Sequence, residues 1–375
     1  MKVLSLFSGC GGLDLGFAQE GYEIVGAFDH WGPAVDCHNH NAHLLGGHAE
    51  KKSLALDDGE IELNSLPNVD VVLGGPPCQG FSFAGKQRID DPRNNLYLDF
   101  KRIVGHLKPR IFLMENVRGL EKMALEAVQR SFNEIGYQVT VQRVDCTLLG
   151  LAQRRERIII VGSQKTDKKF QTPDILLGSL FGASSEPVPL IDVIKDLPKP
   201  ESGRGVTAPS LNYLDDHKYL PFSALEQKFI PHIPNGGYFR NAPRDMLPTR
   251  LQKIFDDPAS YKNPRLFPKP NPSKPVQTIP ASSSPSIGGV IAPDLDYQNG
   301  LCIPISVEEN TKAGIYTSPV NSRRFTAREA ARLQGFPDNF LFTGSLSSKT
   351  RMIGNAVPVP LGRLFAKEIK EQYFD

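Results

Sequence analysis

Apolar and polar residues fall into separate blocks along the first half of the chain. Short apolar runs bounded by glycine or proline predict buried strands, and longer runs with apolar residues three or four positions apart predict helices. The predicted strands cover residues 3–7, 22–28, 69–73, 111–114, 137–144 and 157–161. The predicted helices include residues 96–107, residues 120–135 and a segment beginning near residue 13. Strands that alternate with helices predict an α/β fold with a doubly wound sheet.

The pattern changes after Gly162. Residues 163–320 are rich in proline, serine, glycine and asparagine, which predicts a loop-rich second domain. A regular pattern returns with a helix that Thr326 caps together with Glu329, and with an amphipathic helix near the end, over residues 363–373. We therefore expect three parts along the chain: residues 1–188, residues 189–340, and residues 341–375, which complete the first part.

Composition narrows the class of protein. The chain has 375 residues, of which 40% are hydrophobic, enough for one large domain and a smaller one. A net charge of +2 neither requires nor excludes a polyanionic partner. The five cysteines lack metal-ligand spacing, so we expect reduced thiols in a cytoplasmic protein and no zinc site. No apolar run is long enough for a transmembrane helix, and we expect no membrane partner.

A loop after the strand at 69–73 carries the first candidate chemistry. Residues 74–82 read GGPPCQGFS, in which two glycines allow a sharp turn and two prolines stiffen the backbone that leads into Cys78. The thiol is thereby presented in one direction, as a nucleophile must be; a buried structural cysteine beside an ordinary turn is the alternative. Residues 83–93 are polar and basic, either a loop that closes on a phosphate backbone or a plain solvated loop.

The glycine-rich turn at residues 8–12 lies between the first strand and the first helix. Such a turn lets backbone N–H groups approach a ligand closely, although the GxGxxG phosphate fingerprint is absent. Asp29 comes about 20 residues after the glycines, at a strand end where a carboxylate commonly holds a ribose diol. Together these features favour a nucleoside cofactor over a merely tight turn. The histidines at residues 30–48 are irregularly spaced, which favours solvated or capping side chains over a metal site.

Charged residues stand at two later strands. Glu115 lies at the carboxyl end of the strand at 111–114, the edge where doubly wound sheets place ligands, and would face Cys78 there as a proton donor. A helix cap is the alternative. Residues 153–157 read QRRER, and Arg155 and Arg157 point the same way on an extended chain, so both guanidinium groups can reach one anion. A solvated, charged strand edge is the alternative.

Basic and aromatic residues are interleaved in the second domain, a mixture suited to the grooves of nucleic acid. A solvated basic surface explains this stretch equally well. The residues are Arg240, Arg244, Arg250, Lys253, Lys262, Arg265, Lys269 and Lys274, with Tyr238, Phe239, Tyr261 and Phe267.

Taken in order, these motifs resemble the DNA (cytosine-5) methyltransferase family, specifically its compact bacterial restriction-modification enzymes. The matching segments are FSGCGG at 7–12, GPPCQGFS at 75–82, ENV at 115–117, QRRER at 153–157, REAARLQGFP at 328–337 and GNAV at 354–357. The resemblance implies a Rossmann-like, S-adenosylmethionine-dependent catalytic domain and a smaller target recognition domain. The acidic residue with which the family contacts the cofactor adenine has no clear counterpart near residues 48–53.

The resemblance also implies a reaction and a set of site residues. A methyl group passes from S-adenosylmethionine to C5 of a flipped-out cytosine in a short DNA sequence, through a covalent adduct between Cys78 and C6. The implied catalytic residues are Cys78, Glu115, Arg155 and Arg157. The implied cofactor contacts are Phe7, Ser8, Gly9, Gly11, Asp29, His30, Pro76, Leu96, Asn355 and Val357. The implied DNA contacts are Ser82, Asn116, Val117, Arg157 and Thr278.

The expected partner is double-stranded DNA, and a monomer suffices for the chemistry. A cognate restriction endonuclease would act on the same site without a stable complex. One alternative is a related tRNA cytosine methyltransferase, whose Cys-Phe-Thr element is not evident here. A second is a DNA-binding protein without turnover, which would not need all four catalytic residues. A third is a nucleotide-dependent oxidoreductase, which would not need a Gly-Pro-Pro-Cys loop.

Overall fold

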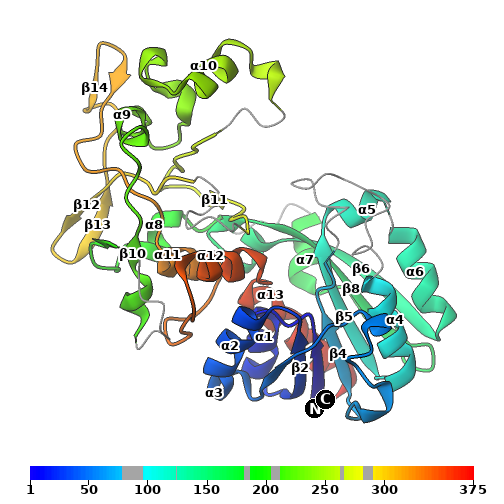
Figure 1. Ribbon diagram of the computed structural model, residues 1–375. Coiled ribbons are helices and arrows are strands. Elements are labelled where there is room, and N and C mark those ends of the chain that lie inside the picture. Colours follow the sequence, from blue (N-terminus) through cyan, green and yellow to red (C-terminus); the bar gives the residue numbers. More distant parts are fainter. Residues whose placement is uncertain (78–95, 124, 181–185, 204–211, 262–265, 282–289) are drawn as a thin grey trace. The chain divides into compact units, whose positions relative to one another are not determined.

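The computed structural model describes residues 1–77, 96–123, 125–180, 186–203, 212–261, 266–281 and 290–375. The chain forms two compact units, shown in Figure 1. The first unit contains Met1–Gly150, Arg155–Glu186 and Ala356–Asp375. The second contains Leu151–Arg154 and Pro187–Asn355.

A seven-stranded sheet forms the centre of the first unit. Its strands, in sheet order, are β3 (Ala49–Lys51), β2 (Glu23–Asp29), β1 (Lys2–Leu6), β4 (Val71–Gly74), β5 (Ile111–Val117), β8 (Glu156–Gln164) and β6 (Tyr137–Asp145). Neighbouring strands are parallel, except that β8 runs antiparallel to both β5 and β6. The mixed sheet with crossover helices confirms the predicted α/β, Rossmann-like class.

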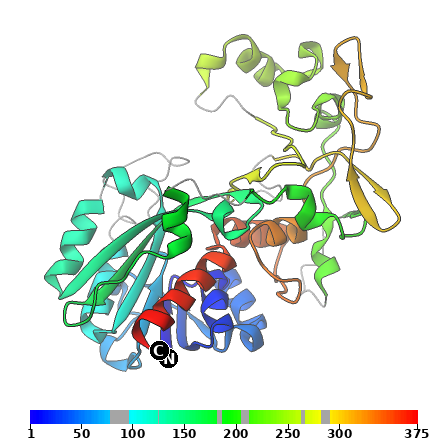
Figure 2. The same cartoon turned by 180° about the vertical axis from the view of Figure 1, so that it is seen from behind.

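Helices cover both faces of this sheet. They are α1 (Gly12–Gln19), α2 (Gly32–His40), α3 (Ala42–Leu45), α4 (Leu96–Leu107), α5 (Gly119–Met123), α6 (Leu125–Glu134), α7 (Asp174–Leu180) and α13 (Val359–Tyr373). Figure 1 shows α4 and α6 beside β5 and β6, and Figure 2 shows α13 crossing the opposite face. Helices α1 and α13 pack at glycines, because a Cβ on Gly16 would lie 2.4 Å from the backbone nitrogen of Arg363.

Alternation along the strands explains the two helix layers. Leu4 and Leu6 of β1 join an apolar cluster with Phe112 of β5 and with Phe100 of α4, all fully buried. Ser5 lies between the two leucines, faces the other way, and reaches α1. The sheet is therefore buried on both sides, and only its edges and strand ends are open to ligands.

The sequence located most elements of this unit. The predicted strand at 111–114 is longer than expected, because β5 continues to Val117 and includes Glu115. The predicted helix at 120–135 corresponds to α5 and α6. Helix α13 begins at Val359, four residues before the predicted start at 363. Helices α2 and α3 and strand β3 were not predicted.

The second unit is rich in loops, as expected. Its helices are α8 (Leu190–Ile194), α9 (Glu226–Phe229), α10 (Thr249–Asp256), α11 (Ala327–Leu333) and α12 (Leu346–Asn355). Its strands form short ladders: β7 (Gln153–Arg154) with β11 (Val276–Gln277), β9 (Glu201–Ser202) with β10 (Lys218–Tyr219), β12 (Leu295–Gln298) with β13 (Leu301–Pro304), and β14 (Thr311–Lys312) with β15 (Ile315–Tyr316).

Helix α11 begins with the predicted capping box. The Thr326 hydroxyl accepts a hydrogen bond from Glu329 N at 3.1 Å, and the Glu329 carboxylate accepts from Thr326 N at 2.9 Å. The arrangement satisfies two N–H groups that a helix start otherwise leaves without partners.

Candidate active site and cofactor loop

Four strand ends bring predicted site residues to one edge of the main sheet. Leu6 pairs with both Phe28 and Gly74, and Gly74 pairs with Met114. Because these strands are parallel and in register, the residues immediately after those positions stand in one row along the carboxyl edge. In sheet order that row is Asp29, Phe7, Gly75 and Glu115.

Asp29 fixes the turn between β1 and α1. One carboxylate oxygen accepts a hydrogen bond from Gly9 N at 2.9 Å, and the other accepts from Trp31 N at 2.9 Å. The turn needs this support because Phe7, a residue with a side chain, has a φ of 56°. Ser8 N donates to the carbonyl of Phe28 at 3.1 Å and completes the attachment.

The two sides of this turn differ in the space they leave. Among the described residues, no atom lies within 4 Å of the position that a Cβ on Gly9 would take. A Cβ on Gly11 would instead lie 2.8 Å from Leu45 Cδ1 and 3.1 Å from His38 Cδ2. The Gly9 side is therefore open to a ligand and the Gly11 side is closed by protein. His30 is 69% exposed, with Nδ1 3.5 Å from Asp29 Oδ1.

A buried polar network lies behind the closed side. The Ser5 hydroxyl donates to Asp14 Oδ1 at 2.5 Å, and Asp14 Oδ2 lies 3.0 Å from His38 Nε2. The side chains of Asp14 and His38 are fully buried. The prediction that the histidines are solvated or capping is therefore wrong for His38. The sequence contained an indication of this burial, because Asp14 interrupts the apolar face of α1 and a buried carboxylate needs a polar partner.

Glu115 and Arg157 form an ion pair at the end of β5. Arg157 Nε lies 2.8 Å from Glu115 Oε1, and both side chains are 12% exposed. Strand pairing sets this geometry, since Val117, the last residue of β5, pairs with Arg157 of β8. Glu115 Oε2 lies 3.4 Å from the position of a Cβ on Gly75, so the carboxylate is in contact with the segment after β4.

The first residues of the predicted nucleophile loop lie against β5. Asn116 is 3% exposed, and its Nδ2 donates to the carbonyl of Pro76 at 3.1 Å. Cys78 and Ser82 fall outside the described residues. Leu96, where the described chain resumes, is the first residue of α4 and is half-buried.

Arg155 is buried rather than part of a solvated strand edge. It is 1% exposed, and its Nη2 donates to the carbonyl of Ala356 at 3.0 Å. Burial lowers the pKa of Arg155 to about 9; the nearby Arg157 acts in the same direction and Glu115 opposes it. The guanidinium therefore remains a cation at neutral pH and interacts electrostatically with both Arg157 and Glu115.

The other described site residues are divided between the two units. Thr278 belongs to the second unit, where its hydroxyl donates to the carbonyl of Arg154 at 2.7 Å. Asn355 is the last residue of α12 and is exposed, whereas Val357 belongs to the first unit and is half-buried.

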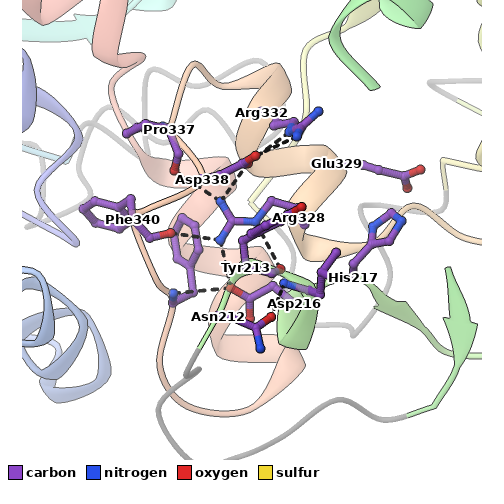
Figure 3. A network of polar contacts seen from close by, with 12 residues as sticks. Asn212, Tyr213, Asp216, His217, Arg328, Glu329, Arg332, Pro337, Asp338 and Phe340 are labelled. Atoms are coloured by element: carbon purple, nitrogen blue, oxygen red, sulfur yellow. Dashed lines mark hydrogen bonds and ion pairs between the residues drawn. The ribbon is translucent and has the colours of Figure 1, made fainter. Parts of the chain in front are cut away.

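Buried ions connect separate segments of the second unit (Figure 3). Arg328 of α11 is fully buried, and its Nη2 lies 3.3 Å from Asp216 Oδ2 and 2.9 Å from the carbonyl of Phe340. Lys349 Nζ donates to Asp216 Oδ1 at 2.7 Å. Burial lowers the pKa of Arg328, and the carboxylate of Asp216 opposes that shift.

The basic residues of this unit have varied surroundings. Lys269 is 1% exposed and donates to Asp294 Oδ2 at 2.7 Å, so its expected place on a basic surface is wrong. The guanidinium of Arg240 lies 4.8 Å from the ring centre of Phe255. Lys262 and Arg265 are not among the described residues.

The described parts of the chain contain no group of three His, Cys, Asp or Glu side chains placed to hold a metal ion. They also contain no helix long and apolar enough to cross a membrane.

A seven-stranded, Rossmann-like sheet with a glycine-rich turn and carboxylates at its carboxyl edge is a type of fold that binds nucleoside-containing cofactors. Residues 1–371 match the family described as C-5 cytosine-specific DNA methylase. The chain belongs to this family, and the predicted family resemblance is confirmed.

Individual relatives agree along the whole chain. The Type II methyltransferase M.FnuDI of Fusobacterium nucleatum is 34% identical over 388 aligned positions, covering 100% of this chain and 96% of that protein. M.NgoPII of Neisseria gonorrhoeae is 33% identical, covering 99% and 96%. The fold resembles a prophage-encoded putative DNA modification methyltransferase from E. coli, with a TM-score of 0.68 and 21% identity over 100% of both chains.

Proposed function

We propose that this methyltransferase is the modification enzyme of a type II restriction-modification system. It methylates C5 of one flipped-out cytosine in a short, specific sequence of double-stranded DNA. The observation that carries the proposal is the Glu115–Arg157 ion pair beside Gly75 and Pro76, three and two residues before Cys78, in a chain of this family. Similarity to Type II methyltransferases over their full length supports the restriction-modification context.

The chemistry follows from the weak nucleophilicity of cytosine C5. The Cys78 thiolate adds to C6, while the Glu115 carboxyl in its protonated form donates a hydrogen bond or the proton to N3, so that an electron pair becomes available at C5. After C5 has taken up the methyl group, a water molecule or hydroxide takes the C5 proton, the C6–S bond breaks and N3 returns its proton to Glu115, which restores the aromatic ring and the thiolate. Arg157 holds the Glu115 carboxylate in place, and the cationic Arg155 positions the sugar, phosphate or base edge.

The turn at residues 7–12 fits S-adenosylmethionine, which when bound supplies an electrophilic methyl group. The open space at Gly9 allows a close approach to the backbone, and the ligand has no phosphate that a GxGxxG turn would bind. Asp29 and the exposed His30 would bind the nucleoside. The other proposed contacts are Phe7, Ser8, Gly11, Pro76, Leu96, Asn355 and Val357.

On the DNA side, Ser82, Asn116, Val117, Arg157 and Thr278 are the proposed contacts. Flipping a base out of the duplex costs a few kcal/mol, which these contacts must offset. The enzyme is proposed to act as a monomer. A cognate endonuclease would recognise the same DNA sequence without forming a stable complex with it.

Bisulfite sequencing tests the proposal directly. Plasmid DNA is incubated with the purified protein and S-adenosylmethionine, and the expected result is conversion-resistant cytosine in one short repeated context. Cys78→Ser should abolish the protection and retain cofactor binding. Glu115→Gln should slow the reaction by about 10²- to 10⁴-fold, the usual contribution of a positioned acid.

Retained methylation by Cys78→Ser would rule out the covalent route. Cofactor binding without any protected cytosine would shift the assignment to an RNA substrate or to a DNA-binding protein without turnover.

A further inference from the structure

A ring of hydrogen bonds and short chain segments runs through Arg155. Gln153 and Gln334 are fully buried in the second unit, and Gln153 Nε2 donates to Gln334 Oε1 at 2.6 Å. Gln334 Nε2 donates to the carbonyl of Ile353 at 3.0 Å. In the first unit, Arg155 Nη2 donates to the carbonyl of Ala356 at 3.0 Å. The chain closes the ring, because Arg155 comes shortly after Gln153 and Ala356 shortly after Ile353.

Gln153 also holds two further segments. Its Oε1 accepts a hydrogen bond from Ile279 N at 2.8 Å, and its Nε2 donates to the carbonyl of Leu333 at 3.0 Å. Next to it, Thr278 donates to the carbonyl of Arg154. Both donors and the acceptor of the Gln153 amide are therefore engaged, so the side chain has one orientation.

Stability alone does not require two glutamines at this place. Burying an amide costs free energy that its hydrogen bonds roughly return, whereas an apolar side chain of the same size would stabilise the unit without direction. What the amides add is a directional constraint on the backbone at residues 153 and 353. Those two backbone positions lead into Arg155 and into its acceptor, Ala356.

We propose that Gln334 is a positioning residue for methyl transfer. It fixes the guanidinium of Arg155 through two routes, one by way of Gln153 and the chain to Arg155, the other by way of Ile353 and the chain to Ala356. The inference rests on the proposed function, in which Arg155 contacts the substrate.

The test is a double-mutant cycle on the single-turnover rate of methyl transfer. Gln334→Met and Gln153→Met keep the side-chain length and remove the amide. Each should lower the rate constant by about 10- to 100-fold, the effect expected when a reacting group is misplaced by a fraction of an ångström to 1 Å. The affinity for S-adenosylmethionine should be unchanged. The double variant should be no slower than the slower single variant, because both changes break the same ring.

Gln142→Met is the matched control. Gln142 of β6 is 9% exposed, and its Nε2 donates to the Thr172 hydroxyl at 2.5 Å, so this change also removes a buried amide but lies outside the ring. Its rate constant should equal that of the wild type.

Active-site titration separates positioning from a merely structural role. If Gln334→Met reduces only the fraction of active enzyme, or if the two substitutions act additively, the proposal is overturned. If that variant does not fold, Gln334→Glu keeps the acceptor for Gln153 and removes the donor to Ile353; a wild-type rate there would overturn the route through Ala356. Absence of methylation by the wild type would instead refute the proposed function.

Discussion

Both units have buried aromatic cores, but the fully buried pairs of Lys or Arg with a carboxylate lie, among the described residues, in the second unit. In the first, the rings of Phe100, Phe112 and Phe132 pack against one another, with the Phe112 ring centre 5.9 and 4.2 Å from those of Phe100 and Phe132, and all three are fully buried. In the second, the residues around α11 meet at the carboxylate of Asp216, which pairs with both Arg328 and Lys349.

The difference arises because the backbones of the two units are held in place in different ways. A seven-stranded sheet already fixes the backbone of the first unit, so non-directional apolar burial can stabilise most of its interior. The second unit has ladders of only two to four residues, which specify little by themselves. A buried ion pair needs its partner at one distance and orientation, so a few of them can fix loops that are distant in sequence. The surface of the second unit can then vary in sequence while these ion pairs keep its backbone in place.

Removal of Arg328, the buried cation of α11, should have the largest effect on the stability of the second unit. Arg328→Met should destabilise the second unit by about 3 to 5 kcal/mol, since it removes one of the two cations paired with the buried Asp216 carboxylate. DNA binding and methylation should be lost, while S-adenosylmethionine binding by the first unit survives. Urea unfolding monitored by both binding activities measures the effect.

An exposed ion pair provides the control for that prediction. Arg244 pairs with Asp256 on the surface of the same unit, each side chain 50% exposed, and Arg244→Met should leave stability unchanged. Equal unfolding curves for the two variants would show that buried charge does not organise the second unit.

Backbone strain in the turn between β1 and α1 should affect cofactor binding by the first unit. Gly11 has a φ of 94° and little space beside it. Gly11→Ala should weaken S-adenosylmethionine binding about tenfold, because a left-handed residue with a Cβ costs roughly 1–2 kcal/mol and 1.4 kcal/mol is one factor of ten. Isothermal titration measures the affinity.

Gly136 makes a matched control for backbone strain. Its φ is also 94°, it lies between α6 and β6, and no described atom lies within 4 Å of its Cβ position. Gly136→Ala should lower stability and leave cofactor affinity unchanged. If both variants bind the cofactor equally well, the turn does not shape the cofactor site.

The two units also differ in how far their sequences predicted them. In the first, short apolar runs bounded by glycine or proline located most strands, and the position of Glu115 after such a run placed it correctly at the carboxyl edge. Local pattern could not give the antiparallel direction of β8, because strand direction depends on distant pairing. The polar sequence of α2 hid a helix and the buried role of His38.

In the second unit only the capped helix α11 was predicted. Its two-residue ladders carry no periodicity, and the partner of Arg328, Asp216, is 112 residues away. The ionic character of Arg328 and Lys269 was visible in the sequence, but their burial was not. Family motifs recovered the location of Gln153 and Arg155, and the hydrogen bonds that join them to distant segments required the structure.

The smallest predicted effect concerns pH and the second unit alone. His217 Nε2 donates to the carbonyl of Pro198 at 2.7 Å, so Nδ1, 3.0 Å from the Thr326 hydroxyl, accepts from it in the neutral ring. Burial lowers the pKa of His217, although Glu329 and the Pro198 carbonyl oppose the shift. The folded state therefore favours the neutral ring, and below the unfolded histidine pKa of about 6.5 the unfolded chain binds more protons.

Stability of the second unit should consequently fall as the pH drops from about 7.5 to 5.5, across the titration of an unfolded histidine. His217→Gln, which can still donate to Pro198, should reduce that loss, whereas His43→Gln at an exposed position should not. Thermal unfolding at the two pH values measures the difference. An identical loss of stability in wild type and His217→Gln would mean that folding does not lower the pKa of His217. Water would then have access to the polar side chains around α11.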